Sequence, residues 1–235
     1  MTAVGVASAA NFGQGHNEPY ARALANGSGT LTLRPDSGHH QAESVDFDVR
    51  SWCGEATVLE RSLLRSLQGP VLDVGCGPGR LLAAAQRIGL AALGIDTSAE
   101  AVGRARGRGA RALEQSVFAP VPHSGLWQSV ILLDGNIGIG GSITSLLRRC
   151  SQLIAPYGTV LAEVEADDDL DVVYSAVLVD QNGNQSAPFL WARTGSAGLV
   201  SRAARSGWTV TAIERVQGRV FCRLSPASMR DRIMG

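Results

Sequence analysis

The sequence predicts an α/β fold with a doubly wound, mostly parallel seven-stranded sheet and an antiparallel edge strand. Five short apolar runs alternate with segments of helical periodicity, at residues 70–74, 91–95, 110–115, 128–133 and 159–164. Two strand-like segments then follow one helix and are joined through Gly218. Strands that are separated by helices imply a parallel sheet covered on both faces, and the closing pair implies an antiparallel edge.

Composition narrows the possible functions. The chain has 235 residues, 45% of them hydrophobic and 18% charged, which is enough apolar material for a complete core. Its 21 basic residues balance 21 acidic ones, so there is no electrostatic case for binding nucleic acid or an anionic membrane. Every basic residue is arginine, which excludes Schiff-base lysine chemistry and the phosphate-binding lysine of P-loop enzymes.

The cysteines and the N-terminus indicate a cytoplasmic protein without a metal. Four cysteines lie far apart and lack metal-ligand spacing, so we expect reduced thiols; they are Cys53, Cys76, Cys150 and Cys222. The N-terminus lacks the charged start and apolar core of a secretory signal. No apolar stretch approaches the length of a membrane span.

Residues 71–79, Val-Leu-Asp-Val-Gly-Cys-Gly-Pro-Gly, are the most informative segment. An apolar strand ends on Asp73 and runs into Gly75, Gly77 and Gly79, directly before a helical segment. Glycines let the backbone approach a ligand closely, and a new helix offers free N–H groups. The carboxylate of Asp73 suits a cation and would repel a pyrophosphate. This segment therefore predicts a site for a positively charged ligand.

Asp96 ends the next apolar run, 21 residues after Gly75. At that distance a second parallel strand returns beside the first, and an acidic side chain there can accept two hydrogen bonds from a ribose diol. The segment Asp96-Thr97-Ser98 is also a good helix start. Both interpretations can hold together, with Thr97 or Ser98 capping the helix and Asp96 on the ribose.

These motifs resemble those of the class I S-adenosylmethionine-dependent methyltransferases, from about residue 70 to residue 224. The resemblance implies that S-adenosylmethionine is the cofactor. It places the glycine turn, with Asp73, Gly75, Cys76, Gly77 and Gly79, against the methionine part. Asp96 would hold the ribose, with Thr97 beside it. In this family the loop after the third strand holds the adenine, and here it offers Ser116 and Val117 where an acidic residue is usual.

Two other interpretations of the turn remain open. The dinucleotide-binding fingerprint is Gly-x-Gly-x-x-Gly, but here the third glycine comes one residue early and Arg80 replaces the final glycine or alanine. The second interpretation is a tight strand-to-helix turn that binds no ligand. Asp73 and the early glycine favour the methyltransferase interpretation, because Asp96 would serve a nicotinamide enzyme equally well.

Catalytic residues are expected in two segments. Asp134 and Asn136 begin a glycine-rich segment at 133–141, where the resemblance places the meeting of methyl donor and acceptor. They could accept from the cofactor's ammonium, position the acceptor or take its proton, although a flexible loop whose polar residues cap the next helix is the alternative. His39 and His40 are candidate bases on the N-terminal segment, with solvent exposure as the alternative.

Acceptor contacts are expected from Trp52, Trp191 and Arg193, which lie in the variable parts of the chain. On a strand, Trp191 and Arg193 would share one face and pair an aromatic wall with a cation, which suits a planar or anionic acceptor. Ordinary packing of Trp191 beside a surface arginine is the alternative. Phe118 is expected in the core rather than as a stacking platform.

The sequence thus predicts a small-molecule methyltransferase, acting at oxygen. We expect an N-terminal cap over the acceptor site at 1–53, a methyltransferase domain at 54–224 with a hairpin insertion at about 166–194, and a polar tail at 225–235. An RNA or protein methyltransferase, a nicotinamide oxidoreductase and a non-catalytic nucleotide-binding domain are the alternatives. The sequence carries no signal for the oligomeric state.

Overall fold

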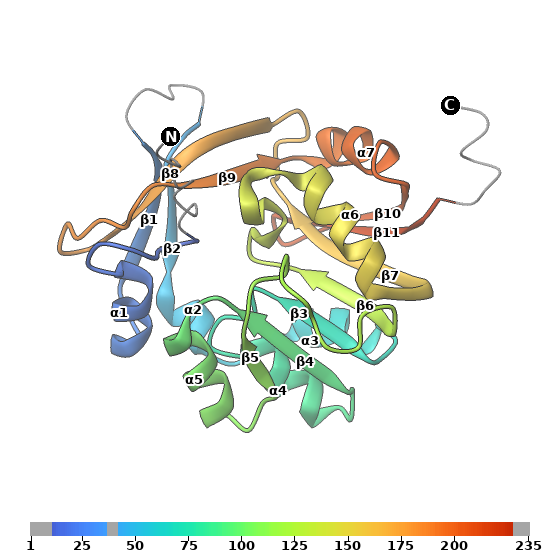
Figure 1. Cartoon of the computed structure of the whole chain (residues 1–235), viewed down its shortest axis with the longest axis horizontal. Helices are drawn as coiled ribbons and strands as arrows, with labels where there is room; N and C mark the ends of the chain where they lie inside the picture. Colours follow the sequence, from blue (N-terminus) through green and yellow to red (C-terminus); the bar gives the residue numbers. More distant parts are fainter. Residues whose placement is uncertain (1–10, 37–41, 228–235) are drawn as a thin grey trace, which may run out of the picture.

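The structure is a computed structural model that describes residues 11–36 and 42–227, and the larger of its sheets has seven strands (Figure 1). Their order across the sheet is β5-β4-β3-β6-β7-β11-β10. Strands β5 to β7 in this order run parallel, and β11 is antiparallel to both of its neighbours. The predicted fold class is therefore confirmed. The antiparallel strand, β11, is the second strand from the edge of the sheet, and β10 is the edge strand. The strand bounds are β3 Val71–Val74, β4 Ala92–Asp96, β5 Ala112–Glu114, β6 Trp127–Leu132, β7 Ile154–Val164, β10 Trp208–Val216 and β11 Arg219–Pro226.

Helices cover both faces of this sheet because its strands are apolar on both sides. In β3, Leu72 and Val74 belong to the cluster that contains the buried face of α6, whereas Val71 belongs to the cluster under α3 and α4. Side chains alternate along a strand, so one short apolar run can serve two layers. The helix bounds are α1 Pro19–Asn26, α2 Val49–Cys53, α3 Val58–Arg65, α4 Arg80–Arg87, α5 Ala99–Gly107, α6 Ile143–Leu153 and α7 Ser196–Ala204.

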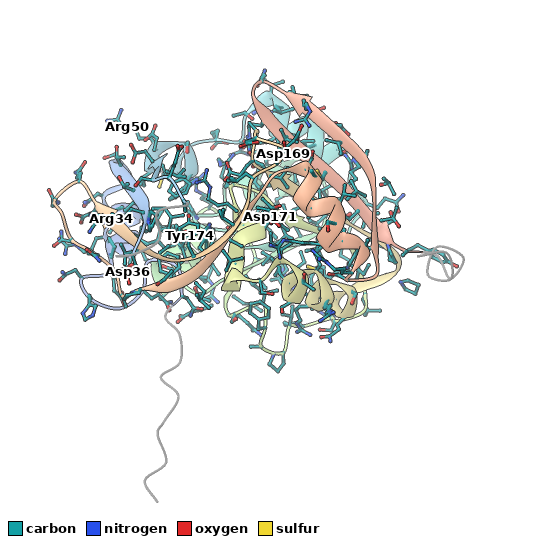
Figure 2. The ribbon with its side chains drawn as sticks, turned by 90° about the horizontal axis from the view of Figure 1, so that it is seen from above. Arg34, Asp36, Arg50, Asp169, Asp171 and Tyr174 are labelled. Atoms are coloured by element: carbon teal, nitrogen blue, oxygen red, sulfur yellow. The ribbon has the colours of Figure 1, made fainter. Side chains whose placement is uncertain are left out.

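A second, four-stranded antiparallel sheet combines two segments that are far apart in the sequence. Figure 1 shows the blue strands β1 and β2 beside the orange strands β8 and β9. Figure 2 looks toward this sheet, where Arg34 marks β1, and Asp171 and Tyr174 mark β8. We call it the cap sheet, in the order β2-β1-β8-β9 with bounds β1 Thr30–Pro35, β2 Val45–Asp48, β8 Asp171–Asp180 and β9 Phe189–Thr194.

The sequence predicted a hairpin at about 166–194, where β8 and β9 lie, but neither β2 nor the pairing of β1 with β8. The β1–β8 register joins Leu31 to Asp180 and Pro35 to Ala176. This pairing crosses more than a hundred positions of the chain, and local periodicity carries no information about it. The N-terminal segment and the hairpin thus form one structural unit.

The glycine-rich segment after β6 folds as η1, a 3-10 helix at Asn136–Gly141, and packs against β9. A Cβ on Gly138 would lie 2.2 Å from the carbonyl oxygen of Ala192. A Cβ on Gly141 would lie 2.6 Å from the Cβ of Leu190. Glycine at these two positions lets the cap sheet approach the main domain. Close packing therefore explains why Gly138 and Gly141 lie in this segment.

We expect Gly138→Ala to destabilise the protein by about 1–3 kcal/mol, because the new methyl group overlaps backbone atoms of β9. Urea unfolding would measure the change. Gly103→Ala is the matched control, since a Cβ there meets nothing within 4 Å on helix α5. The control should gain up to about 1 kcal/mol from helix propensity. Equal stability of the two variants would contradict the close packing of η1 on β9.

Candidate active site

A cavity of about 400 Å³ lies beyond the carboxyl ends of β3, β4, β5 and β6, where open α/β sheets bind ligands. The turn after β3 and the ends of the neighbouring strands line one side. Segments of the N-terminus, η1 and β9 line the other. Most of the sequence-predicted site residues lie here, namely Asp73, Gly75, Cys76, Gly77, Asp96, Thr97, Ser116, Val117, Asp134, Asn136, Trp52 and Trp191.

The glycines of the turn have separate roles. Gly75 and Gly77 line the cavity with φ angles of +73° and +53°, a backbone conformation that glycine adopts without strain. Gly79 does not line the cavity, and its contact with a ligand stays a prediction. A Cβ on Gly79 would lie 2.7 Å from the Cβ of Ala105, which shows that this glycine permits α4 to begin against α5.

Asp73 is buried at the end of β3 and lines the cavity. Its Oδ2 atom is buried and has no hydrogen-bond partner among the described residues. Burial above all, and then the nearby charge of Asp134, raise the pKa of this carboxyl to about 8, although Arg80 opposes the shift. A positive ligand would supply the missing partner and favour the ionised form.

Asp96 holds the glycine turn in place from the end of β4. Its Oδ2 accepts from the backbone N–H of Gly77 at 2.9 Å, and its Oδ1 accepts from the N–H of Ser98 at 2.9 Å. Ser98 is the N-cap of α5, because its side chain accepts from the N–H of Ala101. Burial raises the pKa of Asp96, and these backbone hydrogen bonds oppose the rise.

Asp134 belongs to an ion network behind the cavity. Its Oδ2 accepts from Arg80 at 2.5 Å, and its Oδ1 accepts from Arg219 of β11 at 3.3 Å. Both guanidinium groups also contact Glu60, and Arg219 binds Glu163 at 2.7 Å. The network joins α3, α4, β7 and β11 to the loop after β6.

The network leaves a negative charge, because it combines three carboxylates with two guanidinium groups. Burial alone would raise the pKa of Glu60, but hydrogen bonds from Arg80, the Thr57 N–H and Arg219 lower it to about 2. Glu60 therefore stays ionised at neutral pH. Together with Asp73 and Asp96, the network makes this side of the cavity acidic.

The loop after β5 supplies the third part of the site. Ser116, Val117 and Phe118 line the cavity, and the Ser116 hydroxyl accepts from the N–H of Phe118 at 3.3 Å. Phe118 is 47% exposed, so its expected place in the core was wrong. Gly140 explains the position of this ring, since a Cβ there would lie 2.7 Å from it.

Six aromatic rings from distant segments line the opposite side of the cavity, and we call them the aromatic cluster. Their ring centroids lie 5.1–6.4 Å apart in a connected set of contacts. They come from the N-terminal segment, α1, β2, α2 and β9. The members are Phe12, Tyr20, Phe47, Trp52, Phe189 and Trp191.

The sequence analysis found Trp52 and Trp191 but missed the other four rings. Only 5% of the chain is aromatic, and this scarcity is the signal that could have drawn attention to each ring. Trp191 also packs against η1, since a Cβ on Gly138 would lie 2.7 Å from its ring. Its packing and cavity-lining interpretations therefore both hold.

Arg193 does not line the main cavity but lines a neighbouring one together with Trp191, so their pairing over an acceptor stays a prediction. It binds Glu165 at 2.7 Å and the carbonyl of Glu43 at 3.1 Å, and it lines a second cavity of about 320 Å³. The two cavities share Phe47, Trp52, Asp134 and Trp191. His39 and His40 lie outside the described residues, as does most of the predicted polar tail.

Asn136 is held in place rather than free. Its side-chain amide donates to the carbonyl of Gly75 at 2.9 Å, which ties η1 to the glycine turn.

In the described ranges, no group of three His, Cys, Asp or Glu side chains is arranged to hold a metal ion. No helix in those ranges is long and apolar enough to cross a membrane.

Comparison with known proteins agrees with this geometry. The sequence profile of the methyltransferase domain family matches residues 48–189, which is more than half of the chain. A comparison with curated protein sequences found no significant match.

Solved methyltransferase structures share the fold at low sequence identity. A Bacteroides fragilis S-adenosylmethionine-dependent methyltransferase bound to S-adenosyl-L-homocysteine is 22% identical, with a TM-score of 0.71 over 89% of this chain and 95% of that one. The CcbJ methyltransferase of Streptomyces caelestis is 14% identical, with a TM-score of 0.59 over 75% and 92%. The Burkholderia thailandensis 1,6-didemethyltoxoflavin-N1-methyltransferase is 16% identical, with a TM-score of 0.53 over 73% and 78%. The chain therefore belongs to the methyltransferase domain family and is an S-adenosylmethionine-dependent enzyme.

Proposed function

We propose that this enzyme methylates a small molecule that lies between the glycine turn and the aromatic cluster. The observation that carries the proposal is that one cavity has these two different sides. The acidic side fits a positively charged nucleoside, and the aromatic side fits an acceptor. Such a cavity matches the size and lining of small-molecule sites.

The residues of the acidic side fit the cofactor. Asp73, whose buried Oδ2 has no partner in the described structure, would face positive charge. Asp96 would hold the ribose through lone pairs that its backbone contacts leave free. Ser116 and Val117 would lie against the adenine. Backbone of the glycine turn and Thr97 would complete the site, as Gly75, Cys76 and Gly77 line the same cavity.

The bound cofactor supplies a methyl group on a positively charged sulfur. The protein's task is to align the acceptor with that methyl group and to exclude water. The N-terminal segment contributes to exclusion, because Gln14 donates to the carbonyl of Thr97 at 2.6 Å across the end of β4. Phe12 lies in the same segment and contacts Trp191 in the aromatic cluster.

The cap assignment from the sequence becomes part of the proposal. Residues 1–53 and the hairpin at about 166–194 would together cover the acceptor, since both contribute strands to the cap sheet. Residues 54–224 would form the catalytic domain. An RNA acceptor is disfavoured, because the charged residues that line the cavity are Asp73, Asp96 and Asp134 against Arg80 alone. A cytoplasmic location stays a prediction.

Methyl transfer at oxygen, as the sequence analysis expects, needs a proton acceptor for most hydroxyl groups. The proposed bases His39 and His40 lie outside the described residues. Asp134 is paired with two arginines, and the Asn136 amide is bound to Gly75. None of the described candidate bases is free to identify the acceptor atom, so an experiment has to identify it.

The direct test is methyl transfer from labelled S-adenosylmethionine to a metabolite library. We expect labelled product in small-molecule fractions, with none in RNA or protein. Label in a macromolecular fraction would contradict the proposed acceptor class. Calorimetry with S-adenosylhomocysteine and with NAD provides the control for the cofactor, and only the former should bind.

Asp96→Asn should weaken S-adenosylhomocysteine binding by about 10–100-fold, since hydrogen bonds to a charged group contribute roughly 1.5–3 kcal/mol. Asparagine keeps one oxygen acceptor for the glycine turn, so the fold is disturbed less than by alanine. Calorimetry would measure the affinity. Asp169→Asn, in an exposed loop labelled in Figure 2, is the matched control and should bind normally. Unchanged affinity in Asp96→Asn would remove this residue from the ribose.

Binding should release a proton from Asp73. Its carboxyl is mainly neutral in the free protein below its pKa of about 8, and a cationic ligand favours the carboxylate. Affinity for S-adenosylhomocysteine should therefore increase as pH rises from about 6 to about 8. Calorimetry in buffers of different ionisation enthalpy counts the proton. Asp73→Asn should abolish the release, and persistence of the full release in this variant would assign the proton elsewhere.

A further inference from the structure

We propose that the acceptor atom is an amine nitrogen on a molecule with an apolar ring, and that the aromatic cluster stabilises the positive charge that this nitrogen gains. This inference rests on the proposed function and replaces oxygen as the methylated atom. Three observations support it: the number of aromatic faces, the sign of the surrounding charge and the pairing of the available bases.

Aromatic side chains are concentrated at this cavity. The chain has 5 Phe, 4 Trp and 3 Tyr, and the aromatic cluster together with Phe118 accounts for seven of these twelve residues. Ring faces carry partial negative charge and attract cations, most strongly where water is excluded. A cluster of this kind also accommodates an apolar ring through stacked and edge contacts.

The charged residues around the aromatic cluster also favour a cation over an anion. Arg80 is the one basic residue among the described residues that line the main cavity, and Glu60 and Asp134 pair with it. The adjoining cavity, which shares three rings of the cluster, is lined by five carboxylates and by Arg193, which is bound to Glu165. An anionic acceptor would meet repulsion here, whereas a cation would be attracted. The five carboxylates of the adjoining cavity are Asp46, Asp48, Asp134, Glu163 and Glu165.

Two of the three described carboxylates that line the main cavity already accept hydrogen bonds, and the third, Asp73, faces the cofactor's positive charge under the proposed function. Asp134 accepts from two guanidinium groups, and Asp96 accepts from two backbone N–H groups. These contacts oppose the rise in pKa that burial causes in both groups, and they occupy lone pairs that would otherwise take a proton. An amine attacks only in its neutral form, so a bound ammonium first passes its proton to water. A hydroxyl group is far less acidic and needs a base positioned at its oxygen.

The transfer step balances without another reactant. The amine lone pair forms the new N–C bond as the C–S bond breaks, and the bonding electron pair passes to sulfur. Sulfur becomes the neutral thioether of S-adenosylhomocysteine, and nitrogen gains one positive charge. A primary or secondary amine then loses a proton to water, while a tertiary amine stays cationic. Positive charge therefore moves from sulfur toward the aromatic cluster.

Three ligands that share one ring and differ in charge test the proposal. Phenethylamine, 2-phenylethanol and phenylacetate would be titrated into the full chain saturated with S-adenosylhomocysteine. We expect the cationic amine to bind about tenfold tighter than the alcohol, a difference that cation–π contacts in an enclosed site can supply. Phenylacetate should bind most weakly. Equal or tighter binding of the alcohol or the acid, or no binding of any of the three, overturns the proposal.

Trp52→Leu separates the aromatic face from apolar volume. Trp52 is partly exposed and lies 5.2 Å from Phe47 and 6.0 Å from Tyr20 between ring centroids. The variant should lose most of the preference for the amine over the alcohol while it still binds S-adenosylhomocysteine normally. Tyr157→Leu, which removes a ring that is 93% exposed outside both cavities, is the control. An unchanged preference in Trp52→Leu overturns the role of the cluster.

Methyl transfer distinguishes this inference from the proposed function. With labelled cofactor, we expect N-methylation of phenethylamine and no label in 2-phenylethanol. Label on the alcohol oxygen in place of the amine nitrogen would overturn the inference and leave the proposed function intact. Failure of S-adenosylhomocysteine to bind would instead overturn the cofactor assignment on which both depend.

Discussion

Buried carboxyl groups at the carboxyl ends of β3, β4 and β6 are the constraint on which the site depends. Asp73, Asp96 and Asp134 come together because parallel strands end at the same edge of the sheet. Backbone N–H groups stabilise Asp96, and arginines stabilise Asp134. Asp73 keeps a buried oxygen without a partner among the described residues. A buried carboxylate of that kind is unfavourable until a positive group arrives, so the fold favours a cationic ligand at this edge.

The cap depends on a different constraint, which is close backbone approach. Gly138 and Gly141 allow η1 to pack against β9, and the Asn136 amide ties the same helix to the carbonyl of Gly75. One short segment therefore contacts both the glycine turn and the strand that carries Trp191. The distance between the two sides of the cavity is set here, and methyl transfer is sensitive to that distance.

Much of the acidic side could be predicted from the sequence, because its residues follow strands that local apolar runs reveal. Asp73 and Asp96 were found in this way, as was the segment that begins at Asp134. The packing role of Gly79 was not predicted, because spacing alone does not separate a glycine that faces a ligand from one that permits helix packing. The ion pair of Arg193 with Glu165 could not be predicted, because Glu165 lies on another segment.

The sequence by itself determined the alternation of strands and helices, the family and the chemistry of the glycine turn, since each depends on neighbouring residues. Only the tertiary structure decided the acceptor side. Phe12, Phe47 and Phe189 are isolated aromatic residues in the sequence, and they become one surface through the pairing of β1 with β8. Strand pairing between distant segments depends on the global packing of the chain, which local patterns do not encode.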